Sequence, residues 1–343
     1  MKPYALLTER GQARRLRALA MNALTHYDLD VVRLRLVTNS MNGIFRADTR
    51  TGERWILRVT LPEGGHSLDH VAAEMDWLAA LARDTALSVP RPLPTRDGAF
   101  VVEAEAPGVP EPRLCTIFSW VPGTDLADHI SPANIVKLGE LMAGLHNHAL
   151  TYAPPQHLDL LRFDRVFPFP EPVVLLKEPF AHLFTPARYT VYRQAIDWAQ
   201  EVIDRLKSCG DPMHILHGDL HQWNVRYARG VLSPIDFEDL MLGWPVQDIA
   251  TTLFYFLDLE AYASLRAAFQ KGYTRHSPWP ERHPGEIDAF IAARGLGLAN
   301  FVLHDPNPAW KIQAAAYIER TEGRLRRLLK NRSVLRGPGG QKL

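Results

Sequence analysis

The chain has 343 residues, of which 46% are hydrophobic and 22% are charged, a globular composition with ample material for a core. Its length exceeds the limit of about 250–300 residues for a single hydrophobic core, which predicts two lobes or two domains. The 39 basic and 38 acidic residues leave a net charge of +1. This balance gives no reason to expect a nucleic-acid partner or an anionic membrane surface.

The cysteines and the N-terminal residues indicate the compartment. Cys115 and Cys209 are far apart in the sequence and lack metal-ligand spacing, which excludes a disulfide scaffold and a zinc ribbon. The first fifteen residues lack the apolar segment of a signal peptide. No apolar run approaches the roughly 18 residues of a membrane span. We therefore expect a soluble cytoplasmic protein with reduced cysteines.

The first third of the chain has the pattern of a β-rich lobe. A helix is expected over residues 8–27, with apolar residues on one face. Alternating segments then predict strands, with a hairpin turn at Thr51-Gly52 between the second and third. Ser67 is a suitable N-cap for a further helix. The expected order is three strands over 31–38, 41–50 and 53–60, a helix over 67–83, and two strands over 98–105 and 113–121.

The composition changes at residues 121–125, and the pattern beyond is mostly helical. Ser131-Pro132 begins a helix that extends to about Leu150. Residues 151–180, rich in proline and phenylalanine, predict an irregular insertion. Further helices are expected over 186–207, 245–258, 260–275, 286–303 and 308–331. We predict an N-terminal lobe over 1–121, a helical C-terminal lobe over 122–332 and a disordered tail over 333–343.

A β-like island at residues 213–237 interrupts the helices and carries the most specific chemistry. Asp219 follows a short apolar strand, and Asn224 lies five residues later. Two strands around Arg229-Gly230 then lead to Asp236, so two hairpin ends would bring these three polar residues together. A carboxylate and an amide oxygen suit Mg²⁺, and a further carboxylate can orient a hydroxyl. This division of labour is typical of phosphoryl transfer.

The segment HGDLHQWN resembles the catalytic loop of the aminoglycoside phosphotransferase and choline kinase-like family, and IDFED resembles its metal-binding segment. The resemblance implies an α+β, protein kinase-like fold with a small antiparallel-sheet lobe and a larger helical lobe. It assigns Asp219 as the catalytic carboxylate and His217 as a brace for the loop. Asn224 and Asp236 would bind Mg²⁺, with Glu238 in support. Asp248, in WPVQDIA, would support the catalytic loop.

The N-terminal lobe fits the same resemblance. Turn residues Ser40, Asn42 and Gly43 could cradle phosphates through backbone amides. The family usually has Lys on the third strand, where this chain has Arg58, whose expected partner is Glu74. Arg keeps the charge but binds phosphate as a planar fork. The adenine of ATP would contact backbone groups from Ser119 to Val121.

The sequence says least about the phosphate acceptor. Candidates for its site are His221, Asp239, Trp244 and Tyr255, since acidic and aromatic side chains suit an amine. The chain is similar to bacterial homoserine kinase-like and stress-response kinase-like members, which favours a small hydroxyl substrate of the homoserine, choline or aminoglycoside type. The oligomeric state cannot be read from the sequence.

Three alternatives remain at this point. One is a bacterial Ser/Thr protein kinase of the stress-response type. Another is a nucleotide-binding pseudokinase, suggested only by Arg58 in place of Lys. The third is a metal-dependent hydrolase in which His217, Asp219 and His221 bind a transition metal.

Overall fold

The computed structural model describes residues 2–39, 42–60, 67–155, 158, 160–305 and 307–336. The chain divides into two compact units, which confirms the expected two-lobed α+β organisation. The N-terminal unit comprises residues 1–124, 151–160 and 226–238, and the C-terminal unit comprises the rest. The predicted boundary at residue 121 is close to the first division. The N-terminal unit additionally takes up the segment that contains Asp236 and Glu238.

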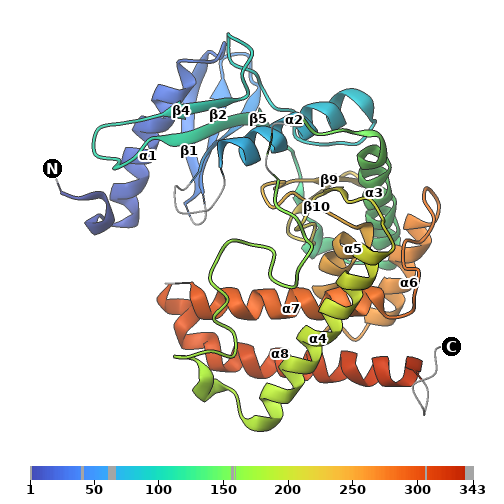
Figure 1. Ribbon diagram of the computed structural model, residues 1–343. Coiled ribbons are helices and arrows are strands. Elements are labelled where there is room, and N and C mark those ends of the chain that lie inside the picture. Colours follow the sequence, from blue (N-terminus) through green and yellow to red (C-terminus); the bar gives the residue numbers. More distant parts are fainter. Residues whose placement is uncertain are drawn as a thin grey trace. The chain divides into compact units, whose positions relative to one another are not determined.

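A five-stranded antiparallel sheet forms the centre of the N-terminal unit, in the order β1-β2-β3-β5-β4 (Figure 1). Between β2 and β3 the chain turns at Gly52, whose φ of 88° is in the left-handed region that glycine tolerates. The predicted hairpin is therefore confirmed. The strands are β1 (Val31–Asn39), β2 (Gly43–Thr49), β3 (Arg54–Val59), β4 (Val101–Ala104) and β5 (Arg113–Ser119).

The two faces of this sheet have different roles. Alternate side chains of β2 and β3, among them Phe45 and Leu57, pack with Leu16 and Leu19 of helix α1 (Glu9–Leu24) in a hydrophobic core. Because successive side chains of a strand point to opposite faces, their neighbours, including Arg58, project from the other face. Helix α2 (Leu68–Asp84) follows β3, and Ser67 caps it by accepting a hydrogen bond from the His70 amide.

A second hairpin belongs to the later part of the N-terminal unit. Strands β8 (Val225–Ala228) and β9 (Val231–Pro234) are joined by Arg229 and Gly230, whose φ values are 51° and 85°. Two consecutive positive φ values are the signature of the tight turn that matches strand twist. The predicted turn at Arg229-Gly230 is thus confirmed. A two-residue strand, β6 (Thr124–Asp125), lies where the chain leaves the sheet region.

The C-terminal unit is mostly helical. Helix α7 packs against α5, α8 and α4, and α4 also packs against α8 (Figure 1). Strands β7 (His214–Leu216) and β10 (Met241–Gly243) form a short antiparallel pair within it. The helices are α3 (Pro132–Thr151), α4 (Pro186–Ser208), α5 (Pro245–Phe254), α6 (Tyr262–Tyr273), α7 (Glu286–His304) and α8 (Pro308–Arg336).

One sequence prediction is corrected here, and one helix bears on the expectation that the chain has no membrane span. Helix α8 continues to Arg336, so residues 333–336 are helical and do not belong to the predicted disordered tail. Helix α7 is long and apolar enough by composition to cross a membrane, the one such helix in the described ranges, although the sequence showed no uninterrupted apolar run. Most of this segment, 72%, is buried inside the protein, as in a core helix of a globular fold.

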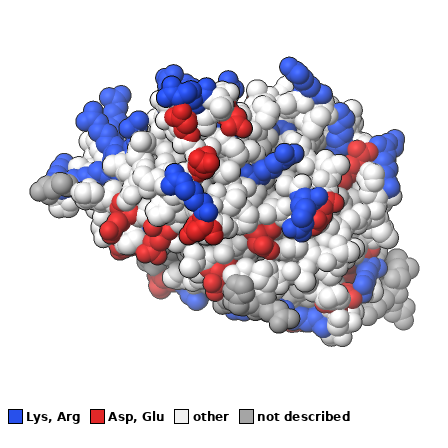
Figure 2. Space-filling model, turned by 90° about the horizontal axis from the view of Figure 1, so that it is seen from above, with Lys and Arg blue, Asp and Glu red and all other residues white. Residues whose placement is uncertain are grey.

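Basic and acidic side chains are intermixed over the face seen in Figure 2. This pattern agrees with the near-zero net charge of the chain. This face carries no field of one sign, which directs attention to individual clusters of residues.

Candidate active site

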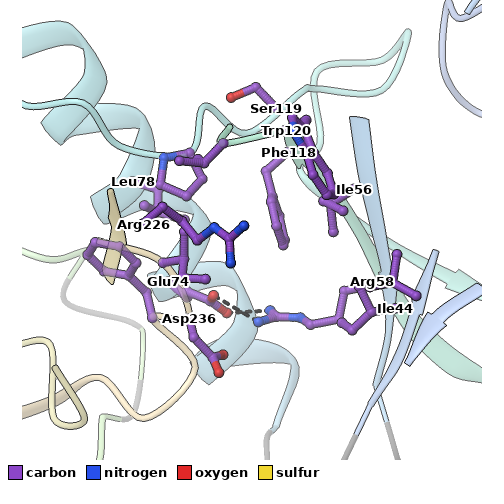
Figure 3. Close-up of a pocket in the computed structure, with 15 residues that line it drawn as sticks. Ile44, Ile56, Arg58, Glu74, Leu78, Phe118, Ser119, Trp120, Arg226 and Asp236 are labelled. Carbon is purple, nitrogen blue, oxygen red and sulfur yellow. Dashed lines mark hydrogen bonds and ion pairs between the residues drawn. The ribbon is translucent and has the colours of Figure 1, made fainter. Parts of the chain in front are cut away.

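The N-terminal unit contains a cavity of about 360 Å³ on the face of the sheet opposite α1 (Figure 3). One wall is apolar and includes Ile44, Ile56 and Phe118, and the other end carries charged side chains. Of the predicted nucleotide-site residues, Arg58, Glu74, Ser119 and Val121 line it, together with the predicted metal ligand Asp236. The remaining lining residues are Val37, Leu78, Pro90, Trp120, Arg226, Ile235 and Phe237.

Arg58 and Glu74 form a buried, two-pronged ion pair at the charged end of the cavity (Figure 3). Arg58 Nη1 donates to Glu74 Oε1 at 2.9 Å, and Nη2 donates to the other carboxylate oxygen. Their side chains are only 3% and 2% exposed. Burial opposes the charge of Arg58, but Glu74, and then Glu238 and Asp236, raise its pKa above the usual range. The guanidinium is therefore held as a fixed cation, as the sequence predicts for this strand and helix.

Glu238 is connected to the β1–β2 turn as well as to Arg58. Asn42 Nδ2 donates a hydrogen bond to a carboxylate oxygen of Glu238, and Arg58 Nη1 lies 3.7 Å from that oxygen. The His70 Nε2 atom is 2.6 Å from the Glu238 backbone carbonyl oxygen. Glu238 is thus held between Asn42, Arg58 and His70. Gly43 begins β2, and Ser40 is outside the described residues.

Asp236 is presented by a strained backbone at the end of β9. Its φ of 65° is in the left-handed region, which is uncommon for a residue with a side chain and is typical of functional positions. The next residue, Phe237, is buried and packs edge-to-face on Trp77 with ring centroids 5.5 Å apart. This anchor fixes the segment, while Asp236 itself is exposed toward the cavity.

The predicted catalytic loop lies in the C-terminal unit, after β7. Asp248 of α5 accepts hydrogen bonds from the backbone amides of His217 and Gly218 at 3.0 and 2.9 Å, and its carboxylate lies 3.3 Å from His146 Nε2. Burial alone would raise the pKa of Asp248, but His146, His217 and the Gly218 amide hold it below its usual range. The expected supporting role of Asp248 is consistent with these contacts.

Gly218 is required by the shape of this loop. Its φ is 82°, and a Cβ at this position would overlap the backbone carbonyl oxygen of Asp239. His217 is fully buried, and its Nδ1 accepts from the backbone amide of Asp219 at 3.3 Å. His217 thus contacts the loop backbone beside Asp219, as a residue that braces the loop is expected to do.

Three side chains surround the carboxylate of Asp219. Arg294 of α7 donates to Oδ1, while Oδ2 accepts from Asn224 Nδ2 at 3.2 Å and lies 3.4 Å from His221 Nε2. Burial would raise the pKa of Asp219, but Arg294 and then His221 outweigh it, so the pKa is lowered. Asp219 is thus an ionised hydrogen-bond acceptor near neutral pH, which suits the orientation of a hydroxyl.

Asn224 is oriented with its amide nitrogen toward the loop. Nδ2 donates to the Asp219 backbone carbonyl at 2.9 Å as well as to its carboxylate, and Oδ1 makes no hydrogen bond to the described residues. The oxygen, which is the atom that a hard cation prefers, remains available. Asn224 and Asp236 belong to different units, so the predicted convergence on one metal remains a proposal.

The residues expected at an acceptor site differ in their surroundings. His221 orders the loop, because its Nδ1 accepts from the amides of Trp223 and Asn224. Tyr255 packs on His221 with ring centroids 4.6 Å apart. Trp244, in contrast, is 4% exposed and donates to the Asp211 carbonyl, which is a packing role at the start of α5.

Asp239 and the alternative metal site can be judged from the same contacts. Asp239 is half-buried beside Gly218, and its charge contributes to raising the pKa of Arg294. His217 directs Nδ1 to the loop backbone, and no cluster of three His, Cys, Asp or Glu suited to a metal occurs in the part of the chain that the structure describes. The hydrolase interpretation of His217, Asp219 and His221 therefore receives no support.

Two functional candidates were not singled out by the sequence. Arg226, on β8, lines the cavity (Figure 3). It also donates to the Gly123 backbone carbonyl. Arg294 contacts Asp219 although 75 residues separate them. A sequence signal for Arg294 exists, because it is a charged residue within the mostly apolar segment IAARGLGLANF, where a buried charge needs a partner.

Comparison with known proteins identifies the family. The model of the phosphotransferase enzyme family matches residues 40–287, which is more than half of the chain and includes both candidate motifs. The chain belongs to the phosphotransferase enzyme family. It is therefore an enzyme of phosphoryl transfer with a kinase-like fold, and the resemblance of HGDLHQWN and IDFED to this family is confirmed.

The relatives described next have sequence identities of 19–28% to this chain. The chain is 25% identical over 234 residues to amicoumacin kinase of Bacillus subtilis, covering 68% of this chain and 66% of that protein. It is 28% identical over 272 residues to the uncharacterized protein sll1119 of Synechocystis, covering 76% and 72%. Among solved structures, a microcompartment-associated aminopropanol kinase has a TM-score of 0.74 at 22% identity, covering 91% and 97%. The amicoumacin kinase hAmiN, in complex with AMP-PNP and Ca²⁺, has a TM-score of 0.71 at 19% identity, covering 92% and 96%.

Proposed function

We propose that this protein transfers the γ-phosphate of ATP to a hydroxyl group of a small molecule in a Mg²⁺-dependent reaction. The observation that carries the proposal is the cavity whose apolar walls end at the Arg58–Glu74 pair and Asp236. An apolar slot with charge at one end matches a nucleotide, which has a flat base and an anionic tail. The named relatives, an aminopropanol kinase and an amicoumacin kinase, support a small-molecule acceptor.

The base of the nucleotide would lie between the apolar walls that include Ile56 and Phe118. The backbone N–H of Val121 makes no hydrogen bond to the described residues, so it can donate to the base. Arg58 at the other end would bind phosphate oxygens through the N–H groups that its fork does not use on Glu74, while Glu74 holds it in place. This arrangement keeps the charge that a Lys would supply, and the change from Lys to Arg does not remove the ion pair.

Oxygen ligands for a divalent cation are present on both motifs. The carboxylate of Asp236, the free Oδ1 of Asn224 and the carboxylate of Glu238 are the hard donors that Mg²⁺ prefers. When bound, the metal would neutralise the charge of the transferring phosphates. The fit rests on the donor types, since all three candidates are oxygen ligands.

Asp219 would act on the acceptor. Its ionised carboxylate accepts the hydrogen bond of the incoming hydroxyl and orients the oxygen toward the γ-phosphorus. The new bond joins the acceptor oxygen to that phosphorus, and the bond between the phosphorus and the β–γ bridging oxygen breaks. ADP leaves, and the hydroxyl proton passes through Asp219 to solvent.

The test is ADP release with a panel of alcohols, in the presence and absence of Mg²⁺. We expect acceptor-dependent ADP release that requires Mg²⁺ and that falls at least about 100-fold in Asp236→Asn. Asp197→Asn, which changes an exposed carboxylate on α4, is the matched control and should retain full activity. Release that is unaffected by Asp236→Asn would contradict the proposed site.

The pseudokinase and protein kinase interpretations make different predictions. A pseudokinase would bind nucleotide without releasing ADP for any acceptor, and a protein kinase would label a protein substrate but no alcohol. Asp219 and Asn224 contact each other within the C-terminal unit, and Arg58 and Glu74 pair within the N-terminal unit; the presence of both pairs favours catalysis. We further propose a cytoplasmic location, which suits the two free cysteines Cys115 and Cys209.

A further inference from the structure

Arg294 is a buried cation placed directly on the carboxylate that would receive the acceptor hydroxyl. Its side chain is 14% exposed, and Nη2 donates both to Asp219 Oδ1 and, at 2.8 Å, to the Tyr255 hydroxyl. The guanidinium also lies 5.7 Å from the centre of the Tyr255 ring. Because an arginine stays protonated in proteins, this positive charge is a permanent feature of the surroundings of Asp219.

The hydrogen-bonding capacity of Arg294 is only partly used. A guanidinium has five N–H donors, and among the described residues only Nη2 makes hydrogen bonds. Nε is buried without a partner. A buried donor without a partner is uncommon in proteins and calls for an explanation such as a missing ligand. Arginine binds a carboxylate best through two of its nitrogen atoms, whereas the Asp219 carboxylate receives a hydrogen bond only from Nη2 of Arg294.

An exposed aromatic surface lies next to this cation. Trp223, within the catalytic loop, is 50% exposed, although large aromatic side chains are usually covered. It packs edge-to-face on Tyr255 and His221 with ring centroids 5.7 and 5.5 Å apart. Trp223 therefore offers an apolar contact beside Asp219 and Arg294, as a small-molecule site requires.

We propose that Arg294 binds an anionic group of the acceptor, so that the preferred substrate is a short alcohol that carries a carboxylate. The inference rests on the proposed function, since it assigns the acceptor class of the same site. One guanidinium would bridge the two ends of such a molecule: Nη2 remains near Asp219, and the unused donors receive the carboxylate. The hydroxyl then lies beside the Asp219 carboxylate. An acceptor whose only charge is an ammonium would be repelled by the fixed cation of Arg294. This differs from the expectation from the sequence, which was an acidic site that binds an amine.

Two carboxylates lie near Arg294, so a bound anion depends on the donors that they leave unused. Asp219 and Asp239 both raise the pKa of Arg294 against the opposing effect of its burial. Asp219 is itself engaged by Asn224 and His221, so it does not depend on Arg294 alone for its partners. Arg294 can therefore share its charge with a ligand without leaving Asp219 unpaired.

The test compares short hydroxy acids with their own carboxamides, such as homoserine with homoserine amide and 4-hydroxybutanoate with 4-hydroxybutanamide. Each pair keeps size and hydroxyl position and differs in one negative charge. Binding is measured by calorimetry with AMP-PNP and Mg²⁺ present, and kcat and KM are measured by ADP release. We expect the wild type to prefer an acid to its amide by about 10- to 100-fold, chiefly in Kd and KM. Arg294→Gln should reduce this preference to below about threefold.

Arg266→Gln is the matched control, because Arg266 also contacts an aspartate and a tyrosine hydroxyl, Asp288 and Tyr262, outside the catalytic loop. It should retain the acid preference. A general loss of Asp219 positioning in Arg294→Gln would lower kcat for acid and amide alike and leave their ratio unchanged, which would overturn the proposal. Equal affinity of acids and amides, or no binding of any acid, would also overturn it.

The failure of this inference and the failure of the proposed function are distinguishable. If amides and uncharged alcohols are phosphorylated as well as acids, the enzyme is a kinase and Arg294 is not its anion site. If acids bind in an Arg294-dependent way but no alcohol releases ADP, the anion site exists and the proposed reaction is wrong.

Discussion

Asp248→Asn is the substitution whose effect on the catalytic loop follows most directly from the structure. The carboxylate of Asp248 is fully buried and accepts from the backbone amides of His217 and Gly218, with His146 also beside it. Asn keeps the size but has one acceptor oxygen. One backbone amide must therefore lose its partner or face the new NH₂ group.

The magnitude can be worked from these contacts. A hydrogen bond to a charged group contributes about 1.5–3 kcal/mol, and a buried amide left without a partner costs about 1–3 kcal/mol. We therefore expect Asp248→Asn to lower the free energy of unfolding by about 3–5 kcal/mol, the range for breaking a buried charged pair. Asp197→Asn, at an aspartate that is 65% exposed and paired with Arg193, should change it by less than about 0.5 kcal/mol.

The assay is urea unfolding followed by circular dichroism and by the activity of the proposed reaction. If the loop depends on Asp248, activity should be lost at lower urea concentration than the bulk helical signal in the variant. A loss in unfolding free energy below about 1 kcal/mol, with the activity midpoint unchanged, would refute the reasoning that Asp248 holds the catalytic loop.

Further predictions concern acid stability, Gly218 and Arg58. The folded state lowers the pKa of Asp248, so the unfolded chain binds more protons in acid. The contribution of Asp248 to the free energy of unfolding is therefore present above about pH 4 and is lost as the pH falls further. The difference in urea unfolding between wild type and Asp248→Asn should shrink below that pH. Gly218→Ala places a residue with a side chain at φ 82°, and its Cβ would overlap the Asp239 carbonyl oxygen. This variant should release ADP at least about 100-fold more slowly, while calorimetry should show that AMP-PNP still binds. Full activity would contradict the need for glycine. Arg58→Lys keeps the charge but cannot make both contacts with Glu74, so thermal unfolding should show a loss of about 1–3 kcal/mol, and an unchanged midpoint would show that the fork is dispensable.

The sheet and the helices of both units could be predicted because their signals are local. Alternation in β2 and β3 separates core residues such as Phe45 from cavity residues such as Ile44, and the bounds of these strands agree with the expected ranges to within a few residues. Turn chemistry at Thr51-Gly52 and Arg229-Gly230 fixes both hairpins. The catalytic loop was recognisable because several constrained residues occur together at short spacing.

Contacts between distant segments could not be predicted in the same way. Asn42 and Glu238 are 196 residues apart, and Glu238 was expected only as a metal ligand, not as a partner of the β1–β2 turn. Arg294 reaches Asp219 from a core helix, and no local pattern connects them. Trp244 is an aromatic residue of the kind that often contacts a substrate, but packing at the start of α5 buries it. The residue type alone does not reveal this burial.

The central claim is that Asp219 directs transfer of phosphate to an alcohol, and the most direct measurement is of the phosphorylated product itself. Wild type and Asp219→Asn are incubated with ATP, Mg²⁺ and each alcohol, and the product is quantified by mass spectrometry. We expect a product 80 mass units heavier than the alcohol from the wild type, about 100-fold or more slowly from Asp219→Asn, with AMP-PNP binding retained. Product formed at the wild-type rate by Asp219→Asn would contradict the account.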